Sequence, residues 1–165
     1  GLETMTESIL RFIDAARATG IDGIYYAVQH AAYPLLSGDE FAAFGRAYDR
    51  RVLESAADLW CNIVHLHGKS VMFDMVADYP MAFLNWHDRD TGISLADGLS
   101  RMRSSASGGV SKWTIHREGP EEALAEIRDA RNQTSDRRLL LGTGCVIMTT
   151  TPLRNIRAMR EAVES

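Results

Sequence analysis

Apolar positions at helical spacing alternate along the chain with short, continuous apolar runs. The first helical pattern consists of Ile9, Leu10, Ile13 and Ala16. It predicts a helix from about Thr6, as its N-cap, to about Thr19. The same criteria predict further helices over residues 39–59, 71–77, 94–102 and 120–131, and a closing helix with Thr151 as N-cap and Pro152 at its first position.

Between these helices lie apolar, β-rich runs that predict strands. They cover residues 23–28, 62–68, 81–86 and 138–144, with a weaker strand or turn at 108–113. This alternation indicates about five parallel βα units, either as an open doubly wound sheet or as part of a (β/α)₈ barrel. A closed barrel typically needs ~250 residues, and the chain has 165. No linker or internal repeat interrupts it, so a single domain over residues 1–165 is expected.

Composition narrows the classes of function. The net charge is −4, from 18 basic and 22 acidic residues, which argues against nucleic-acid binding. No apolar run is long enough for a transmembrane helix, and no signal peptide is visible at the N-terminus. The two cysteines, Cys61 and Cys145, make no disulfide framework and suit a reducing, cytoplasmic setting.

Polar side chains gather where the predicted strands end. In parallel α/β folds, ligands bind at the carboxyl ends of the strands. The residues at or near these ends are Gln29, His30, His65, His67, Asn85, Trp86, His87, Asp88, Lys112, Thr143, Gly144 and Cys145. Four of the five histidines of the chain are among them. The sequence therefore predicts a polar site at one rim of the sheet.

His65 and His67 are the sharpest element of this set. Residues two apart on a strand point to the same face, so both imidazoles face one side. With a thiolate from Cys145 they would form a tetrahedral zinc site with one open position. Two alternatives stay open: the histidines line a pocket without metal, or Cys145 is a small buried apolar residue.

The loop after the third predicted strand offers further candidates. Trp86 and His87 could stack on or hydrogen-bond a flat ligand, or they could pack beside a loop. Asp88 and Asp90 could form an acid–base set, although the sequence favours turn-forming aspartates. Arg89, with Arg101 and Arg103, could bind carboxylates, although solvated loop charges are favoured.

Several motifs resemble those of the uroporphyrinogen decarboxylase superfamily. Residues 143–163, TGCVIMTTTPLRNIRAMREAV, resemble its C-terminal signature. Weaker matches follow the family's order at residues 23–32 with 41–53, at VHLHG (64–68), at LNW (84–86) and at GGV (108–110) with EGPEEALAEI (118–127). The resemblance covers nearly the whole chain.

The resemblance implies the C-terminal half of a (β/α)₈ barrel. The other half would carry the family's catalytic Asp, its propionate-binding arginines and its active-site Tyr. It would be supplied by the rest of a longer protein or by a complementing N-terminal half-barrel, with a homo-oligomer as a further possibility. One hypothesis is that this half-barrel is not catalytic alone and serves as an assembly module.

Two chemistries occur in this superfamily. The first, and the one we predict for this chain, is decarboxylation of a tetrapyrrole without metal or cofactor. By the resemblance, Thr143 aligns with the family's active-site His and Gln29 with its Ser, and His87 joins them as a catalytic candidate. His30 and Trp86 are the substrate-binding candidates.

The alternative is methyl transfer between small substrates and a corrinoid or thiol. This branch holds zinc with His-x-Cys on one strand and a Cys after the last strand. His65 and Cys145 match two of these ligand positions, and His67 replaces the Cys between them. A His/His/Cys zinc site is chemically acceptable.

Overall fold

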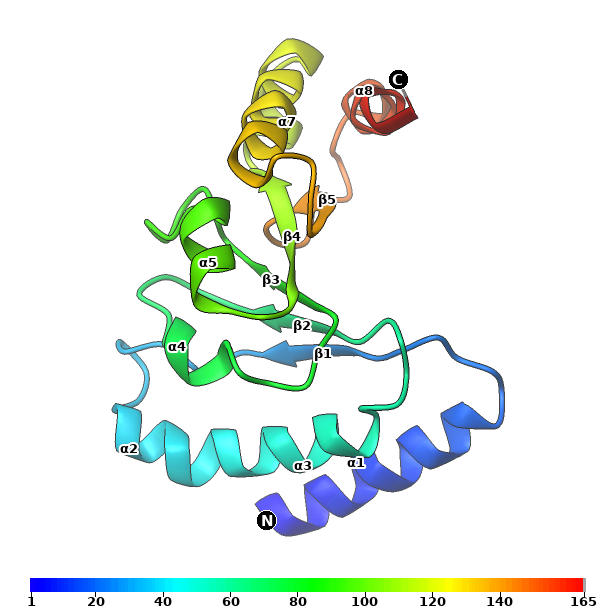
Figure 1. Ribbon diagram of the computed structural model, residues 1–165, viewed down its shortest axis with the longest axis vertical. Coiled ribbons are helices and arrows are strands. Elements are labelled where there is room, and N and C mark those ends of the chain that lie inside the picture. Colours follow the sequence, from blue (N-terminus) through cyan, green and yellow to red (C-terminus); the bar gives the residue numbers. More distant parts are fainter. Residues whose placement is uncertain (165) are drawn as a thin grey trace. The chain divides into compact units, whose positions relative to one another are not determined.

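A computed structural model describes residues 1–164 and places five strands in one sheet, in the order β1-β2-β3-β4-β5 (Figure 1). The strands are β1 (Tyr25–Val28), β2 (Ile63–Leu66), β3 (Phe83–Trp86), β4 (Ser105–Val110) and β5 (Leu139–Thr143). The helices are α1 (Leu2–Arg17), α2 (Gly38–Phe41), the π-helical segment η1 (Ala42–Arg46), α3 (Ala47–Ser55), α4 (Phe73–Val76), α5 (Leu95–Arg101), α6 (Thr114–Arg117), α7 (Pro120–Thr134) and α8 (Leu153–Glu164). The alternation confirms the predicted parallel α/β architecture.

The chain divides into two compact units, one from Gly1 to Leu84 and one from Asn85 onward. In the first unit, β1 and β2 pair in parallel, and α1 and α3 lie on one side of them (Figure 1). The apolar core between helices and strands contains Ile13 of α1, Val52 and Ala56 around the end of α3, and Tyr26 of β1. The helices α1 and α3 therefore cover the face of β1 that carries Tyr26.

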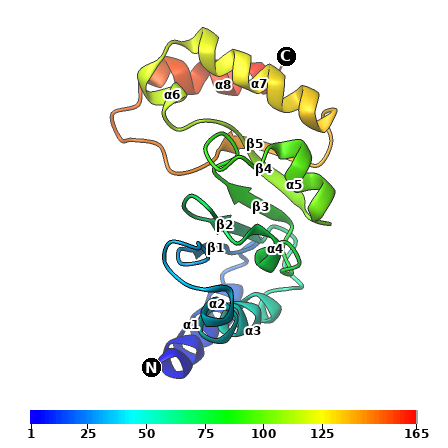
Figure 2. The ribbon, with the colours of Figure 1, turned by 90° about the vertical axis from the view of Figure 1, so that its left-hand side faces the viewer.

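In the second unit, β4 pairs in parallel with β5, and α7 packs against both α8 and β4 (Figure 2). Its core is built from Val110, Ile115 and Ile127, with residues of α8 packed against them. The helix α7 starts as expected, with Pro120 at its first turn and Glu121 and Glu122 at its positive end.

Several predicted boundaries differ from the observed ones. The fourth strand runs over Ser105–Val110 rather than 108–113, because the small residues before Gly108 pair with β5 despite their low strand propensity. The first helix starts at Leu2, so Thr6 is a buried helical residue and not an N-cap. The last helix starts at Leu153, and the carbonyl of Pro152 accepts hydrogen bonds from its first turn.

The long second helix also differs from the prediction for residues 39–59. It contains the π-helical segment Ala42–Arg46 and ends at Ser55. Ser37 caps its start and forms a capping box with Glu40. The apolar periodicity of this region correctly predicts a helix, but it does not reveal the π-helical segment within it.

A buried carboxylate lies on α3 beneath the strands of the first unit. Asp49 accepts hydrogen bonds from the hydroxyls of Tyr26 (2.7 Å) and Tyr79 (2.9 Å). Burial raises the pKa of Asp49, and the two hydroxyl donors partly oppose this rise. Burial and the charge of Asp49 also raise the pKa of both tyrosines. The network consists of neutral donors around one acid.

We expect the stability advantage of an Asp49→Asn variant over the wild type to grow with pH. A raised folded-state pKa stabilises the protonated wild type fully below the ordinary value of 3.8. That stabilisation is lost as the pH rises through the folded-state pKa, whereas asparagine has no such proton. Urea unfolding from about pH 4 to about pH 7 measures this difference. Asp14→Asn, at an exposed site on α1, is the control, and parallel pH curves for wild type and Asp49→Asn would contradict the expectation.

Candidate metal centre

The first unit contributes two histidines at the end of β2. His65 is paired with Ala27 across the β1–β2 ladder, and the backbone N–H of His67 donates to Val28 just beyond it. Nε2 of His65 lies 3.4 Å from Nδ1 of His67, and the ring centroids are 5.5 Å apart. The prediction that both imidazoles face one side is therefore confirmed.

This face of the strands is the one opposite the helices. The register places His65 on the same side as Tyr25, whose ring stacks on the imidazole at 6.1 Å between centroids. Tyr25 is 62% exposed, whereas Val64 and Leu66, which point to the helices, are fully buried. The two histidines thus belong to the sheet face that a complete barrel would enclose.

His87 follows β3 at the start of a tight turn in the second unit. Its carbonyl accepts hydrogen bonds from the backbone N–H groups of Asp90 and Thr91 and from the Thr91 hydroxyl. Its Nδ1 lies 3.8 Å from a carboxylate oxygen of Asp90. A carboxylate beside one ring nitrogen helps to orient an imidazole.

Cys145 follows β5 after Gly144 and is buried, with 6% of its surface exposed. The N–H of Gly144 donates to the carbonyl of Val110 (3.1 Å), which extends the β4–β5 pairing by one residue. The hydroxyl of Thr143 donates to the carbonyl of Cys145 (2.7 Å). These bonds fix the backbone on both sides of the thiol, and the thiol is not in a disulfide.

The remaining predicted site residues lie in different surroundings. Gln29 and His30 are exposed at the end of β1, beside a hollow bordered by Phe41 and Phe44. Trp86 is fully buried, and its indole N–H donates to the carbonyl of Ile93 (2.9 Å). The roles assigned to Gln29, His30, Trp86 and Thr143 stay predictions.

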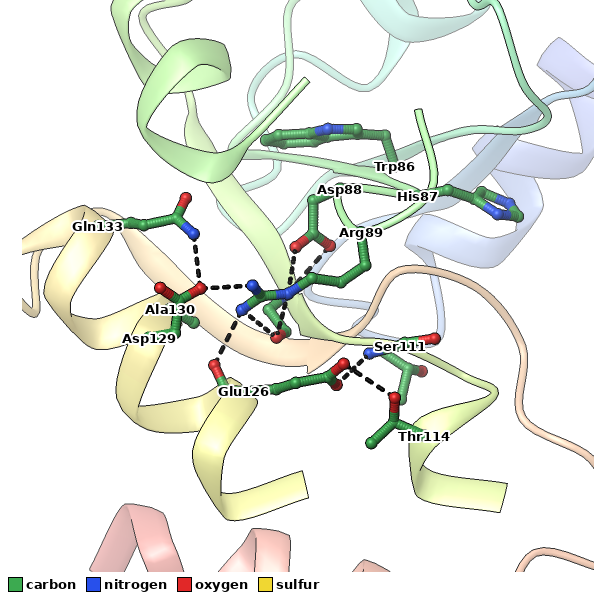
Figure 3. A network of polar contacts seen from close by, with 12 residues as sticks. Trp86, His87, Asp88, Arg89, Ser111, Thr114, Glu126, Asp129, Ala130 and Gln133 are labelled. Carbon is green, nitrogen blue, oxygen red and sulfur yellow. Dashed lines mark hydrogen bonds and ion pairs between the residues drawn. The ribbon is translucent and has the colours of Figure 1, made fainter. Parts of the chain in front are cut away.

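The sequence favoured a turn-forming role for Asp88 and a solvated charge for Arg89, but Asp88 is buried and Arg89 is half-buried in a polar network of the second unit (Figure 3). Asp88 is 7% exposed, and burial raises the pKa of its carboxyl, opposed by the Gly109 N–H and by the charge of Arg89. Loop acids and arginines beside a turn usually face solvent, so composition alone carried no signal for their burial.

His65 and His67 of the first unit and His87 and Cys145 of the second are potential donors to a metal ion. Two or three imidazoles and one thiolate are a donor set that suits zinc. The donor chemistry therefore fits the metal that the sequence suggested.

Among the described residues, no helix is both long and apolar enough to cross a membrane.

A Gly144→Ala variant tests how tightly the thiol-bearing loop is packed. A Cβ at this position would lie 2.7 Å from the Trp86 carbonyl oxygen and 3.1 Å from the His87 Cα, so backbone must shift. We expect the free energy of unfolding to fall by about 1–3 kcal/mol, the usual cost of overpacking, as measured by urea denaturation. The control is Gly142→Ala, whose Cβ would meet Ser107 at an ordinary 3.7 Å. Equal losses in the two variants would contradict this packing.

Comparison with known proteins identifies the family of the chain. A family model described as uroporphyrinogen decarboxylase (URO-D) matches residues 1–165. A search of curated protein sequences gave no match. The family match agrees with the resemblance seen in the motifs.

Solved structures share the fold. A methyltransferase from Methanosarcina mazei has a TM-score of 0.83 at 24% identity, over 96% of this chain and 46% of its own. A B12-independent methionine synthase from Shewanella sp. W3-18-1, in complex with selenomethionine, has a TM-score of 0.61 at 17% identity, over 97% and 52%. The chain thus spans about half the length of the structures it resembles, which confirms the expected half-barrel class. The match of the family model to all of its residues shows that the chain belongs to the uroporphyrinogen decarboxylase (URO-D) family.

Proposed function

We propose that this chain is the metal-binding half of a zinc-dependent methyltransferase of the URO-D family. The observation that carries the proposal is the set of potential metal donors that the two units supply, namely His65, His67, His87 and Cys145. A cofactor-free decarboxylase has no need for a thiol among histidines, whereas a zinc enzyme needs such a donor set. The proposed substrate is a small thiol that accepts a methyl group.

His65, His67 and Cys145 would be the zinc ligands, which leaves one coordination position for the substrate. The metal, when bound, supplies positive charge that lowers the pKa of a substrate thiol. The chain holds its ligands on rigid elements: His65 within β2, and Cys145 directly after β5. Ligands placed this way lose little freedom on binding the metal.

His87 would take the proton that the substrate thiol loses. Its Nδ1 faces the carboxylate of Asp90 at 3.8 Å, which stabilises the imidazolium that forms. The three hydrogen bonds to its carbonyl hold the backbone of this residue in place. In this proposal His87 is a catalytic residue that accepts a proton and is not a metal ligand, which differs from the role in decarboxylation that the resemblance implied.

A second part of the barrel is needed to enclose such a site. β1 and β5 are the outermost strands of the five-stranded sheet, and apolar side chains are exposed on both, with Tyr25 at 62% and Leu140 at 39%. An exposed edge of this kind pairs readily with another strand. The remainder of a longer protein or a complementing half-barrel would supply that strand and the rest of the substrate pocket. The resemblance suggests a corrinoid as methyl donor.

We expect the purified chain to bind about one zinc ion, as in known three-ligand sites. Cys145→Ser and His65→Ala should each weaken zinc binding strongly, because each removes a ligand. Competition with a zinc-sensitive dye measures the dissociation constant, and elemental analysis measures the stoichiometry.

Cys61→Ser is the matched control, because Cys61 precedes β2 and lies outside the group of potential ligands. It should bind zinc as the wild type does. Sub-stoichiometric zinc that does not change in Cys145→Ser would overturn the proposal.

Decarboxylation of a tetrapyrrole is the second candidate, favoured by the description of the family whose model matches the whole chain. The two reactions are separated by incubating the full-length or reconstituted barrel with uroporphyrinogen III and, separately, with a thiol and methylcobalamin. We expect methylated thiol and no loss of carboxyl groups. Formation of coproporphyrinogen in the presence of a zinc chelator would establish decarboxylation instead.

A further inference from the structure

The loop after β3 carries a second feature besides His87: an ion pair between the neighbours Asp88 and Arg89 that ties it to β4 and α7 (Figure 3). Nε and Nη2 of Arg89 donate to the carbonyl of Gly109 at 2.9 and 2.7 Å. Nη2 also donates to the carbonyl of Glu126 (2.9 Å), and Nη1 donates to the carboxylate of Asp129. All three guanidinium nitrogens are thus engaged.

The carboxylate of Asp88 is the other half of this clamp, and its side chain is only 2% exposed. Its Oδ2 lies 3.3 Å from Nε of Arg89, and its Oδ1 accepts the N–H of Gly109 (3.2 Å). A Cβ on Gly108 would lie 2.6 Å from Oδ1, and one on Gly144 would lie 3.2 Å from it. The carboxylate therefore sits directly against the backbone at the ends of β4 and β5.

Two residues of the proposed reaction flank these contacts. His87 directly precedes Asp88, and Cys145 directly follows Gly144. Figure 3 shows the His87 ring turned away from the Arg89 network, while the side chain of Asp88 points into it. The loop thus presents the imidazole on one side and is anchored on the other. Neither Asp88 nor Arg89 has a chemical role in the proposed mechanism.

We propose that Arg89, acting through Asp88, is a positioning residue that holds the His87 loop and the Cys145 loop in fixed relative placement. Its role toward the metal rests on the proposed function. A rigid guanidinium fork that meets two carbonyls and two carboxylates fixes both distance and angle, which a lysine cannot do. Removing Arg89 also leaves the buried charge of Asp88 without its counter-ion.

The first experiment follows hydrogen exchange in the metal-free chain. In Arg89→Ala we expect the amides of residues 86–92 and 143–149 to exchange about tenfold faster or more than in the wild type, because both loops open locally. Exchange in residues 1–84 should stay unchanged. The control is Arg131→Ala, which removes an exposed ion pair with Asp136 in the same unit. If Arg89→Ala does not fold, Asp129→Ala loosens the same fork from its outer side and is measured instead.

The second experiment is a titration with Co²⁺, followed by its thiolate charge-transfer absorption. We expect Arg89→Ala to bind Co²⁺ about 10- to 100-fold more weakly, the usual effect of removing a group that orients a ligand. Arg89→Lys should lie in between, because it keeps the charge but not the fork. Arg131→Ala should match the wild type.

The outcomes separate the two proposals. Unchanged exchange in the two loops, or equally faster exchange everywhere, would overturn the positioning role. Faster loop exchange with wild-type Co²⁺ affinity and spectrum would also overturn it, since Arg89 would then be structural only. Faster loop exchange in a protein whose wild type binds no Co²⁺ would support the clamp and overturn the zinc proposal.

Discussion

Parallel pairing of the strands is the constraint on which the candidate site depends. In a parallel ladder all strands leave the sheet at one edge, so the residues that follow them emerge together. The register shows this within each unit: Val28 of β1 lies beside Leu66 of β2, and Val110 of β4 lies beside Thr143 of β5. The next residues along the chain are the polar ones. The positions of His67 and Cys145 at the ends of their strands therefore follow from backbone pairing and do not depend on side-chain contacts.

The two buried acids show two ways of keeping a carboxylate inside a protein. Asp49 is held by two tyrosine hydroxyls on the helix-covered side of the strands, and burial raises its pKa although both hydroxyl donors oppose the rise. Asp88 has Arg89 beside it and a backbone N–H on one oxygen. Arg89 in turn lowers the pKa of Asp129, chiefly through a hydrogen bond. The Asp49 arrangement involves two hydroxyls only, whereas the Asp88–Arg89 arrangement joins the loop after β3 to β4 and α7.

The sequence predicted the order and type of the elements well, because apolar periodicity reports burial and the strands are short and bounded by polar residues. It misplaced β4, since Ser105, Ala106 and Ser107 have little strand propensity and are strands only through their partners on β5. It identified the two histidines that face the same side, because this inference needs only the two-residue repeat of a strand. It missed the role of Arg89, because the partners of that guanidinium are carbonyls and an acid 20 to 40 residues away in sequence. Such contacts have no local signature.

The replacement of a cysteine by His67 has a consequence for the proposed chemistry. The family's zinc pattern with two thiolates and one imidazole would neutralise the metal's two positive charges, whereas His65, His67 and Cys145 supply a single negative charge. The site would keep one net positive charge until an anionic ligand arrives. A substrate thiolate would then restore neutrality, so a His/His/Cys site lowers the pKa of a bound thiol more strongly than a site with two thiolates. A sulfur held by a more positive metal is also a weaker nucleophile. In the proposed enzyme this donor set would favour formation of the thiolate over its intrinsic reactivity, which would suit an activated methyl donor such as a corrinoid.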